Sequence, residues 1–168
     1  MPAYLFADEK TKANYDPIYN PDRYLSVKNA SWMQLPDQTK DNITVFQFML
    51  ANDSKFAMES VKLLITVKGK DDIVLEKEEI PIEGQVPAAQ SVMVGTLAPD
   101  PHNKTDLPRL MTDSGFAELA KTDPDLQLRY SEGIEVKMQS KEFEKATVDL
   151  LEVHTVVGAK PGGGSKSE

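Results

Sequence analysis

The residues best suited to chemistry lie in the segment "DPHNKTD" at residues 100–106. This segment contains Asp100, His102 and Asp106, and carboxylate oxygens and imidazole nitrogens are ligands of divalent cations. A calcium loop of the EF-hand type also needs a glycine for its sharp turn and a closing glutamate, and this segment has neither. We therefore expect a solvated loop, and we keep a metal-binding or hydrolytic site near these three residues as an alternative hypothesis.

Other catalytic arrangements find little support in the sequence. A nucleophilic mechanism needs a serine, threonine or cysteine beside a base, but the chain has no cysteine, no Gly-x-Ser-x-Gly motif and only two histidines, His102 and His154. No glycine-rich phosphate loop is present, because the only run of glycines lies near the C-terminus. Carboxylate pairs such as Asp71-Asp72 and Glu78-Glu79 fall at predicted turns and strand ends. The sequence predicts a protein that is not an enzyme and that has no cofactor.

The charge of the chain limits its partners. The net charge is −8, with 27 acidic and 19 basic residues, whereas a nucleic-acid-binding surface needs clustered lysine and arginine. No apolar run approaches the ~20 residues of a membrane-spanning helix. We therefore expect a protein partner or a second copy of the chain, no nucleic acid, and a membrane only indirectly through a complex.

The first residues bear on the compartment. They lack the basic and apolar regions of a secretory signal peptide. We expect the periplasm or cell envelope if Met1 was added to a mature chain, and the cytoplasm otherwise.

Apolar residues alternate with polar ones in many short runs, which is the pattern of half-buried strands. Residues 43–50 are apolar on both faces, which predicts a central strand, and Pro81 places its strand at an edge. Seven or eight such strands with frequent turns indicate an antiparallel β-sandwich. The predicted strands are 24–35, 43–50, 60–69, 73–82, 91–98, 126–131, 133–140 and 145–156.

Residues 99–126 interrupt this rhythm and predict one helical insertion at about 106–121. Asp106 is a plausible N-cap, and Pro108 suits the first turn of a helix. We divide the chain into an extended N-terminal arm (1–23), a β-sandwich domain (24–157) with an insertion (99–126), and a flexible C-terminal tail (158–168).

Aromatic residues in and near the arm are the strongest candidates for partner binding. Tyr15 and Tyr19 belong to the arm, and Tyr24 opens the first predicted strand. With strict alternation Trp32 shares a mostly polar face with Tyr24 and Lys28, and a large aromatic there suggests either a cover over the edge of the sandwich or a contact residue. A partly buried core position for Trp32 is the alternative.

The pattern of residues 24–98 resembles small immunoglobulin-like domains of bacterial envelope proteins, of the FxLyD type. The matching parts are "YLSVKNASW", "VFQFMLANDS", "SVKLLITVKGKDD" and "IVLEKEEIPIEGQVPAAQSVMV". The naming motif itself is replaced by Leu64-Ile65-Thr66-Val67-Lys68-Gly69. The resemblance implies an immunoglobulin-like sandwich that serves as an adhesive or scaffolding module at the cell envelope, with no catalytic residues.

These observations favour a non-enzymatic binding or assembly module, an accessory subunit of a cell-envelope complex. Its arm and its insertion would contact the partner, because extensions outside a sandwich often carry function. A self-assembling virion or surface-layer component is the structural alternative.

Overall fold

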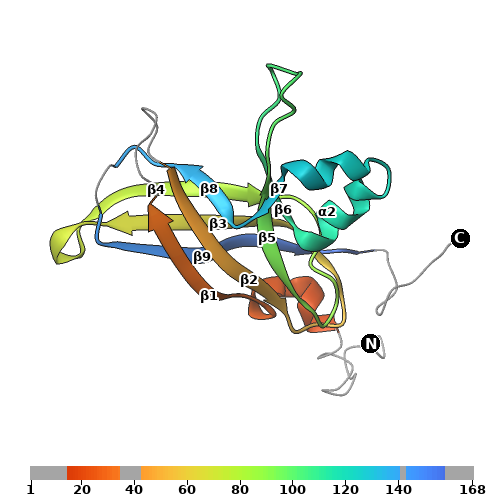
Figure 1. Cartoon of the computed structure of the whole chain (residues 1–168). Coiled ribbons are helices and arrows are strands. Elements are labelled where there is room, and N and C mark those ends of the chain that lie inside the picture. The colour runs from red at the N-terminus through yellow and green to blue at the C-terminus, as the bar shows by residue number, and fades with distance from the viewer. Residues whose placement is uncertain (1–14, 35–42, 141–142, 158–168) are drawn as a thin grey trace, which may run out of the picture.

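The structure is a computed structural model that describes residues 15–34, 43–140 and 143–157. The first 14 residues of the predicted arm and the predicted tail at 158–168 lie outside the described residues, so both stay predictions. The described chain is mainly β, and its strands form two antiparallel sheets joined by one hydrophobic core (Figure 1).

The larger sheet has six strands. β2 is its central strand, as the apolar pattern of residues 43–50 predicted: it pairs with β1 along one side, and with β5 and β8 along the other. β5 also pairs with β6 and β7. The strands are β1 (Leu25–Gln34), β2 (Ile43–Asn52), β5 (Ser91–Leu97), β6 (Arg109–Thr112), β7 (Tyr130–Glu132) and β8 (Ile134–Lys137).

The smaller sheet has three strands in the order β4-β3-β9. They are β3 (Met58–Lys68), β4 (Val74–Ile82) and β9 (Lys145–Thr155). Pro81 lies on the edge strand β4, as predicted, where its missing N–H costs no ladder hydrogen bond. The hairpin between β3 and β4 turns through a 3-10 segment, Lys70–Asp72.

Both sheets contribute side chains to the core. Every second residue of β3 faces it, and the four predicted inward residues are at most 1% exposed: Val61, Leu63, Ile65 and Val67. Phe46, Phe48 and Leu50 of β2 belong to the same cluster. Because the period-2 pattern of β3 places these four side chains on one face, the strand and its orientation follow from local sequence.

The sheets also meet at their edges. The main chain of Glu83, just after β4, forms a parallel bridge with Met111 of β6. Glu83 N–H donates to Leu110 O at 2.8 Å, and Thr112 N–H donates to Glu83 O at 3.0 Å. This bridge fixes the β4–β5 connection against the insertion.

A β-bulge in β1 changes the predicted orientation of Trp32. Lys28 pairs with Met49 and Ser31 with Gln47, so β1 has one extra residue here, and Asn29 has a φ of 58°. One extra residue exchanges the two faces of a strand. The predicted face that Trp32 shares with Lys28 is therefore wrong: Trp32, like Tyr24, packs on the core cluster, whereas Lys28 is exposed and Met33 is 62% exposed.

Three further predictions about the elements also need correction. The insertion does not begin its helix at Asp106: residues 109–112 are strand β6, and α2 spans Asp113–Ala120 with Thr112 as its N-cap. Residues 124–129 form a 3-10 segment, η4, rather than part of a strand. In the described part of the arm, residues 15–19 are helical and Pro21–Arg23 form a 3-10 turn, η2, so this part is not extended.

Candidate functional site

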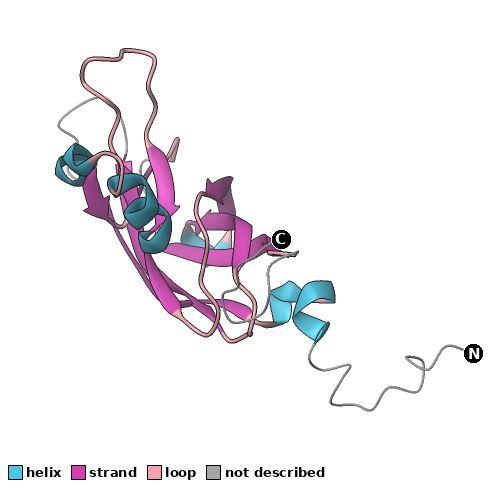
Figure 2. Ribbon diagram, turned by 90° about the vertical axis from the view of Figure 1, so that its right-hand side faces the viewer, coloured by secondary structure: helices cyan, strands magenta, loops and turns pink. Residues whose placement is uncertain are grey.

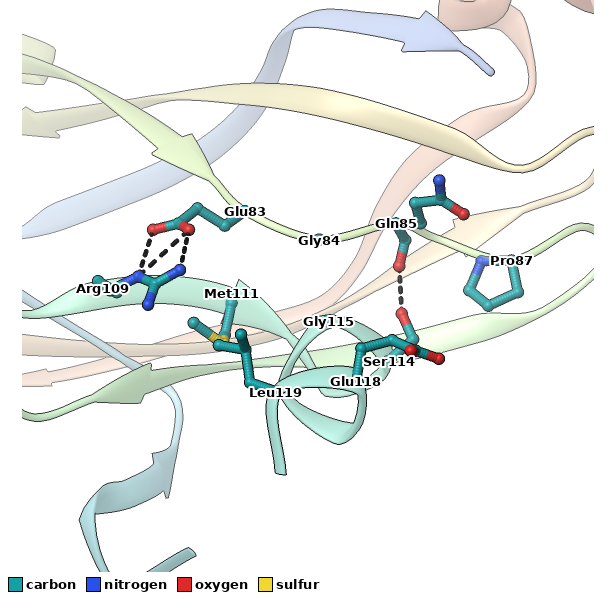
Figure 3. Close-up of a pocket in the computed structure, with 10 residues that line it drawn as sticks. All are labelled: Glu83, Gly84, Gln85, Pro87, Arg109, Met111, Ser114, Gly115, Glu118 and Leu119. Carbon is teal, nitrogen blue, oxygen red and sulfur yellow. Dashed lines mark hydrogen bonds and ion pairs between the residues drawn. The ribbon is translucent and has the colours of Figure 1, made fainter. Parts of the chain in front are cut away.

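A pocket of about 510 Å³, the α2 pocket, lies between the β4–β5 connection and α2. Figure 3 shows its lining residues, which come from residues 83–87 on one side and from β6 and α2 on the other. They are Glu83, Gly84, Gln85, Pro87, Arg109, Met111, Ser114, Gly115, Glu118 and Leu119. The volume falls within the range typical of ligand-binding pockets.

Two glycines bring the two walls of the pocket together. A Cβ atom added to Gly84 would lie 2.8 Å from the Cα of Gly115, and one added to Gly115 would lie 2.8 Å from the Cα of Gly84. Gly84 also has a φ of +92°, which favours glycine. Neither position tolerates a side chain, because the main chains of the connection and the helix are in contact.

Hydrogen bonds hold α2 in this position. The Oγ1 of Thr112 accepts from the N–H of Gly115 at 3.1 Å, which caps the helix, and donates to the carbonyl of Gln85 at 2.9 Å. The hydroxyl of Ser114 donates to the same carbonyl (Figure 3). The first turn of α2 is therefore tied to the opposite wall of the pocket.

A buried asparagine supports the far end of the connection. The side-chain amide of Asn52 donates to Phe56 O at 2.8 Å and to Val86 O at 3.1 Å, and its oxygen accepts from Ser54 N–H at 2.9 Å. These bonds position the residues just before Pro87.

An ion pair closes one end of the pocket. Arg109 donates from Nη2 to Glu83 Oε1 at 2.6 Å and from Nε to Oε2 at 3.0 Å. The hydrogen bond from Arg109 outweighs the opposing effect of burial and lowers the pKa of Glu83. Because two nitrogens of the Arg109 guanidinium donate to the two oxygens of one carboxylate, the pair is bidentate and its charges are largely neutralised.

Stacked aromatic rings fix α2 from the other side. Phe116 stacks on Tyr130 with ring centroids 4.0 Å apart, and the Tyr130 hydroxyl donates to Asp113 Oδ1 at 2.9 Å. A Cβ added to Gly95 of β5 would lie 2.4 Å from the Tyr130 ring, so the ring lies directly on the sheet. Burial is the largest cause that raises the pKa of Tyr130, and the hydrogen bond to Asp113 adds to it.

The chemistry of this pocket suits binding. Ser114 is the only hydroxyl among its lining residues, and its proton is directed to the Gln85 carbonyl, with no histidine beside it. A nucleophile needs a base within hydrogen-bond reach. The pocket instead combines apolar side chains with a few charged groups, which is the composition of recognition sites.

The segment Asp100–Asp106 forms a turn held by its own carboxylates. Asp106 Oδ2 accepts from Asp100 N–H at 2.6 Å, and Asp100 Oδ1 accepts from His102 N–H at 2.9 Å. Among the described residues, no group of three or more metal-ligating side chains is placed to hold an ion. His154 lies on β9, far along the sequence, beside Glu152 at 3.1 Å.

The four predicted contact residues differ in their exposure and in their contacts within the chain. Tyr15 and Tyr19 are 53% and 79% exposed, on the helical turns that Figure 2 shows well apart from α2. The Tyr24 hydroxyl donates to Asp16 Oδ2 at 2.8 Å, and Trp32 packs on Phe143 with ring centroids 4.8 Å apart. Tyr24 and Trp32 therefore have contacts within the chain.

The described part of the arm also packs on its own domain. The hydroxyl of Thr155, at the end of β9, donates to Pro17 O at 2.5 Å, and Asp53 N–H donates to Tyr24 O at 2.8 Å. These bonds attach the helical turns to the ends of β9 and β2.

A second hollow of about 360 Å³ lies beside the loop that precedes β6. Its lining residues are Ile43, Thr96, Ala98, Pro99, Leu107, Pro108, Ser131, Glu135 and Lys137. Compared with the α2 pocket it is smaller, and no contact between glycine backbones shapes it.

No protein family, curated protein or solved structure matches this chain. No helix within the described ranges combines the length and the apolar character needed to cross a membrane.

Sequence reasoning assigned the insertion a binding role but did not find the pocket residues. A Ser-Gly pair such as Ser114-Gly115 is typical of an ordinary turn, and nothing local links Glu83 to Arg109, which lie 26 residues apart. The usable signals were the isolated glycines at 84 and 115, because a glycine outside a tight turn often marks a close approach of two backbones.

Proposed function

We propose that this protein is a non-enzymatic binding module and that the α2 pocket is where it holds a protein partner. One observation carries the proposal: the pocket is a concave site with fixed walls, lined by apolar and charged groups, without a nucleophile–base pair. Such sites serve recognition, because their polar groups orient a ligand and their apolar surface supplies affinity.

The sequence pattern extends this proposal to the class of protein. Two antiparallel sheets around one core, with β2 and β3 as their central strands, support an immunoglobulin-like β-sandwich as the architecture. With the resemblance of residues 24–98 to envelope domains, the module would act as an accessory subunit of a cell-envelope complex. The insertion, and not the tyrosines near the arm, would make the main contact.

Site-specific crosslinking tests the binding role. A photoreactive phenylalanine analogue replaces Leu119, which lines the pocket, or, as a control, Leu151, which is 46% exposed on β9. In cells of the native source we expect one protein to crosslink at position 119 and not at 151. The L119R variant, which fills the pocket with a charged side chain, should lose this partner in co-purification, whereas L151R should keep it.

The same experiment separates the proposal from self-assembly. If the crosslinked species at position 119 is a second copy of the chain, the module is a structural component and the accessory-subunit proposal is wrong. If neither position crosslinks and L119R behaves like the unchanged chain, the pocket has no partner.

A further inference from the structure

The charged groups of the pocket indicate the chemistry of its partner, and this inference rests on the proposed binding function. The lining residues contain two acids, Glu83 and Glu118, and one base, Arg109. Arg109 donates to Glu83 through Nε and Nη2, so the charges of these two residues offset each other. Among the lining residues this leaves the carboxylate of Glu118, whose ion-pair partner Lys121 lies outside the lining.

Glu118 is available to a partner. It forms an ion pair with Lys121 at 2.9 Å, and the two side chains are 73% and 69% exposed. Exposed pairs of this kind, three residues apart on a helix, contribute little free energy. A cation entering the pocket can therefore replace Lys121 at small cost.

Apolar surface lies between the charged ends of the pocket. Figure 3 shows Met111 and Leu119 between the Glu83–Arg109 pair and Glu118, and Pro87 lies on the opposite wall. An aliphatic stem with a cationic head matches this arrangement, because lysine and arginine bury their methylene groups against apolar surface while the charge stays near water or a carboxylate.

Several hydrogen-bond donors in and beside the pocket already have acceptors within the chain. The hydroxyls of Thr112 and Ser114 are both directed to Gln85 O, and the side-chain amide of Gln85 donates to Glu59 at 3.4 Å. An anionic ligand would find its only cation already neutralised and would be repelled by Glu118. The chain as a whole has a net charge of −8, which favours approach of a basic partner.

We propose that the α2 pocket binds a basic, extended peptide segment of the partner, with a lysine or arginine side chain lying over Met111 and Leu119 and its cationic head at Glu118. The Glu83–Arg109 pair closes the pocket and sets its length. The volume of about 510 Å³ accommodates a side chain together with its flanking main chain.

Fluorescence anisotropy with labelled hexapeptides tests this inference on the full chain. The probes are three repeats of Lys-Leu, Gln-Leu or Glu-Leu. We expect the Lys-Leu peptide to bind at least about tenfold more tightly than the Gln-Leu peptide at low salt, and the Glu-Leu peptide to bind weakest, with the preference reduced by salt. Equal binding of the Lys-Leu and Gln-Leu peptides would overturn the inference.

A matched pair of variants excludes attraction by overall charge. E118K and D149K each change the net charge by two units, and Asp149 is exposed on β9, outside the pocket. E118K should weaken binding of the Lys-Leu peptide about tenfold, whereas D149K should weaken it by less than about twofold. Equal effects of the two variants would show that the peptide binds without using Glu118.

The outcomes distinguish this inference from the proposed function. If a partner crosslinks at position 119 through a neutral or acidic segment, identified by mass spectrometry, the basic-peptide inference is wrong and the binding function stands. If no partner crosslinks and the Lys-Leu peptide shows no preference over the Gln-Leu peptide, both fail.

Discussion

Gly84 and Gly115 are in direct backbone contact, and this contact builds the candidate site. Gly84 follows the edge strand of one sheet, and Gly115 lies in the first turn of α2, which extends from the other sheet. A Cβ on either residue would lie 2.8 Å from the Cα of its counterpart. The pocket therefore depends on two residues that have no side chain, whereas Glu83, Arg109 and Glu118 supply its charge.

The contact predicts that G115A destabilises the protein although alanine is the better helix former. Alanine gains up to about 1 kcal/mol in intrinsic helix propensity, but its methyl group forces α2 away from Gly84 at a cost of about 1–3 kcal/mol. Urea unfolding should show a net loss of stability, and hydrogen exchange should rise in α2.

G69A is the control for that experiment. A Cβ on Gly69 meets only the flexible side chain of Leu75, at 3.2 Å, and Gly69 has no positive φ. G69A should therefore change the free energy of unfolding by less than about 1 kcal/mol. A stabilised G115A would contradict the contact between the two backbones.

The positions of these pocket residues could not be derived from local sequence, unlike the core. Val61, Leu63, Ile65 and Val67 recur at every second position of β3, and that period alone fixes their shared face. Gly84 and Gly115 approach each other only when β6 pairs with β5 and the Glu83–Met111 bridge forms. Such pairings depend on segments far apart in the chain.

The errors in the predicted elements have similar causes. Pro108 and the apolar residues around it resemble the start of a helix, but pairing of residues 109–112 with β5 makes them a strand. The helix begins only after Thr112, whose side chain caps it. In β1 the bulge at Asn29 has a weak local signal, since asparagine tolerates a positive φ, and it alone reverses the orientation of Trp32.

The contacts of Tyr130 predict that both its ring and its hydroxyl hold the insertion in place. Y130F keeps the stack on Phe116 but loses the hydrogen bond to Asp113, and it should cost about 1 kcal/mol. Y130L also removes the stack, which adds about 0.5–1.5 kcal/mol. Thermal or urea unfolding of the two variants measures both steps, and equal losses would show that the ring makes no contribution.

The pKa of Tyr130 gives this prediction a pH dependence. Burial and the hydrogen bond to Asp113 raise its pKa above the ordinary value. A raised pKa contributes stability that is complete below the unfolded-state pKa and is lost as the pH rises through the folded-state value. The unchanged protein should therefore lose stability at alkaline pH relative to Y130F.

Two glutamates on β4 predict a second pH dependence. Burial opposes ionisation of Glu76, but hydrogen bonds from Glu78 and from the N–H groups of Ser140 and Gln139 outweigh it, and the pKa of Glu76 is lowered. The hydrogen bond to Glu76 is the largest cause that raises the pKa of Glu78. At a pH between the two pKa values, Glu76 is ionised while Glu78 is still protonated.

The directions of these two pKa shifts determine how stability should change with pH. The stability from Glu76 is lost as the pH falls through its folded-state pKa, and the stability from Glu78 is lost as the pH rises through its own. The side-chain amide of E78Q still donates a hydrogen bond but does not titrate, so this variant should not lose stability as the pH rises through the pKa of Glu78. The stability at stake is less than about 1 kcal/mol, because both groups are partly exposed. Urea midpoints across the acidic and neutral range measure it, with the exposed E79Q as control. An E78Q profile that matches the unchanged protein would show that the two carboxyl groups share no proton.

Removing the side chain of Trp32 should destabilise the protein, whereas removing that of Tyr19 should not. Trp32 packs on Phe143, which is 8% exposed, and on the core cluster, so W32A should cost about 2–4 kcal/mol. Tyr19 is 79% exposed, and Y19A should stay within about 0.5 kcal/mol. Urea unfolding gives both values.

If W32A were as stable as the unchanged protein, Trp32 would be free for a partner, as the strict alternation of β1 predicted. A large loss in W32A, with partner crosslinking at position 119 retained in Y19A, would instead place recognition at α2 and leave Trp32 to the core.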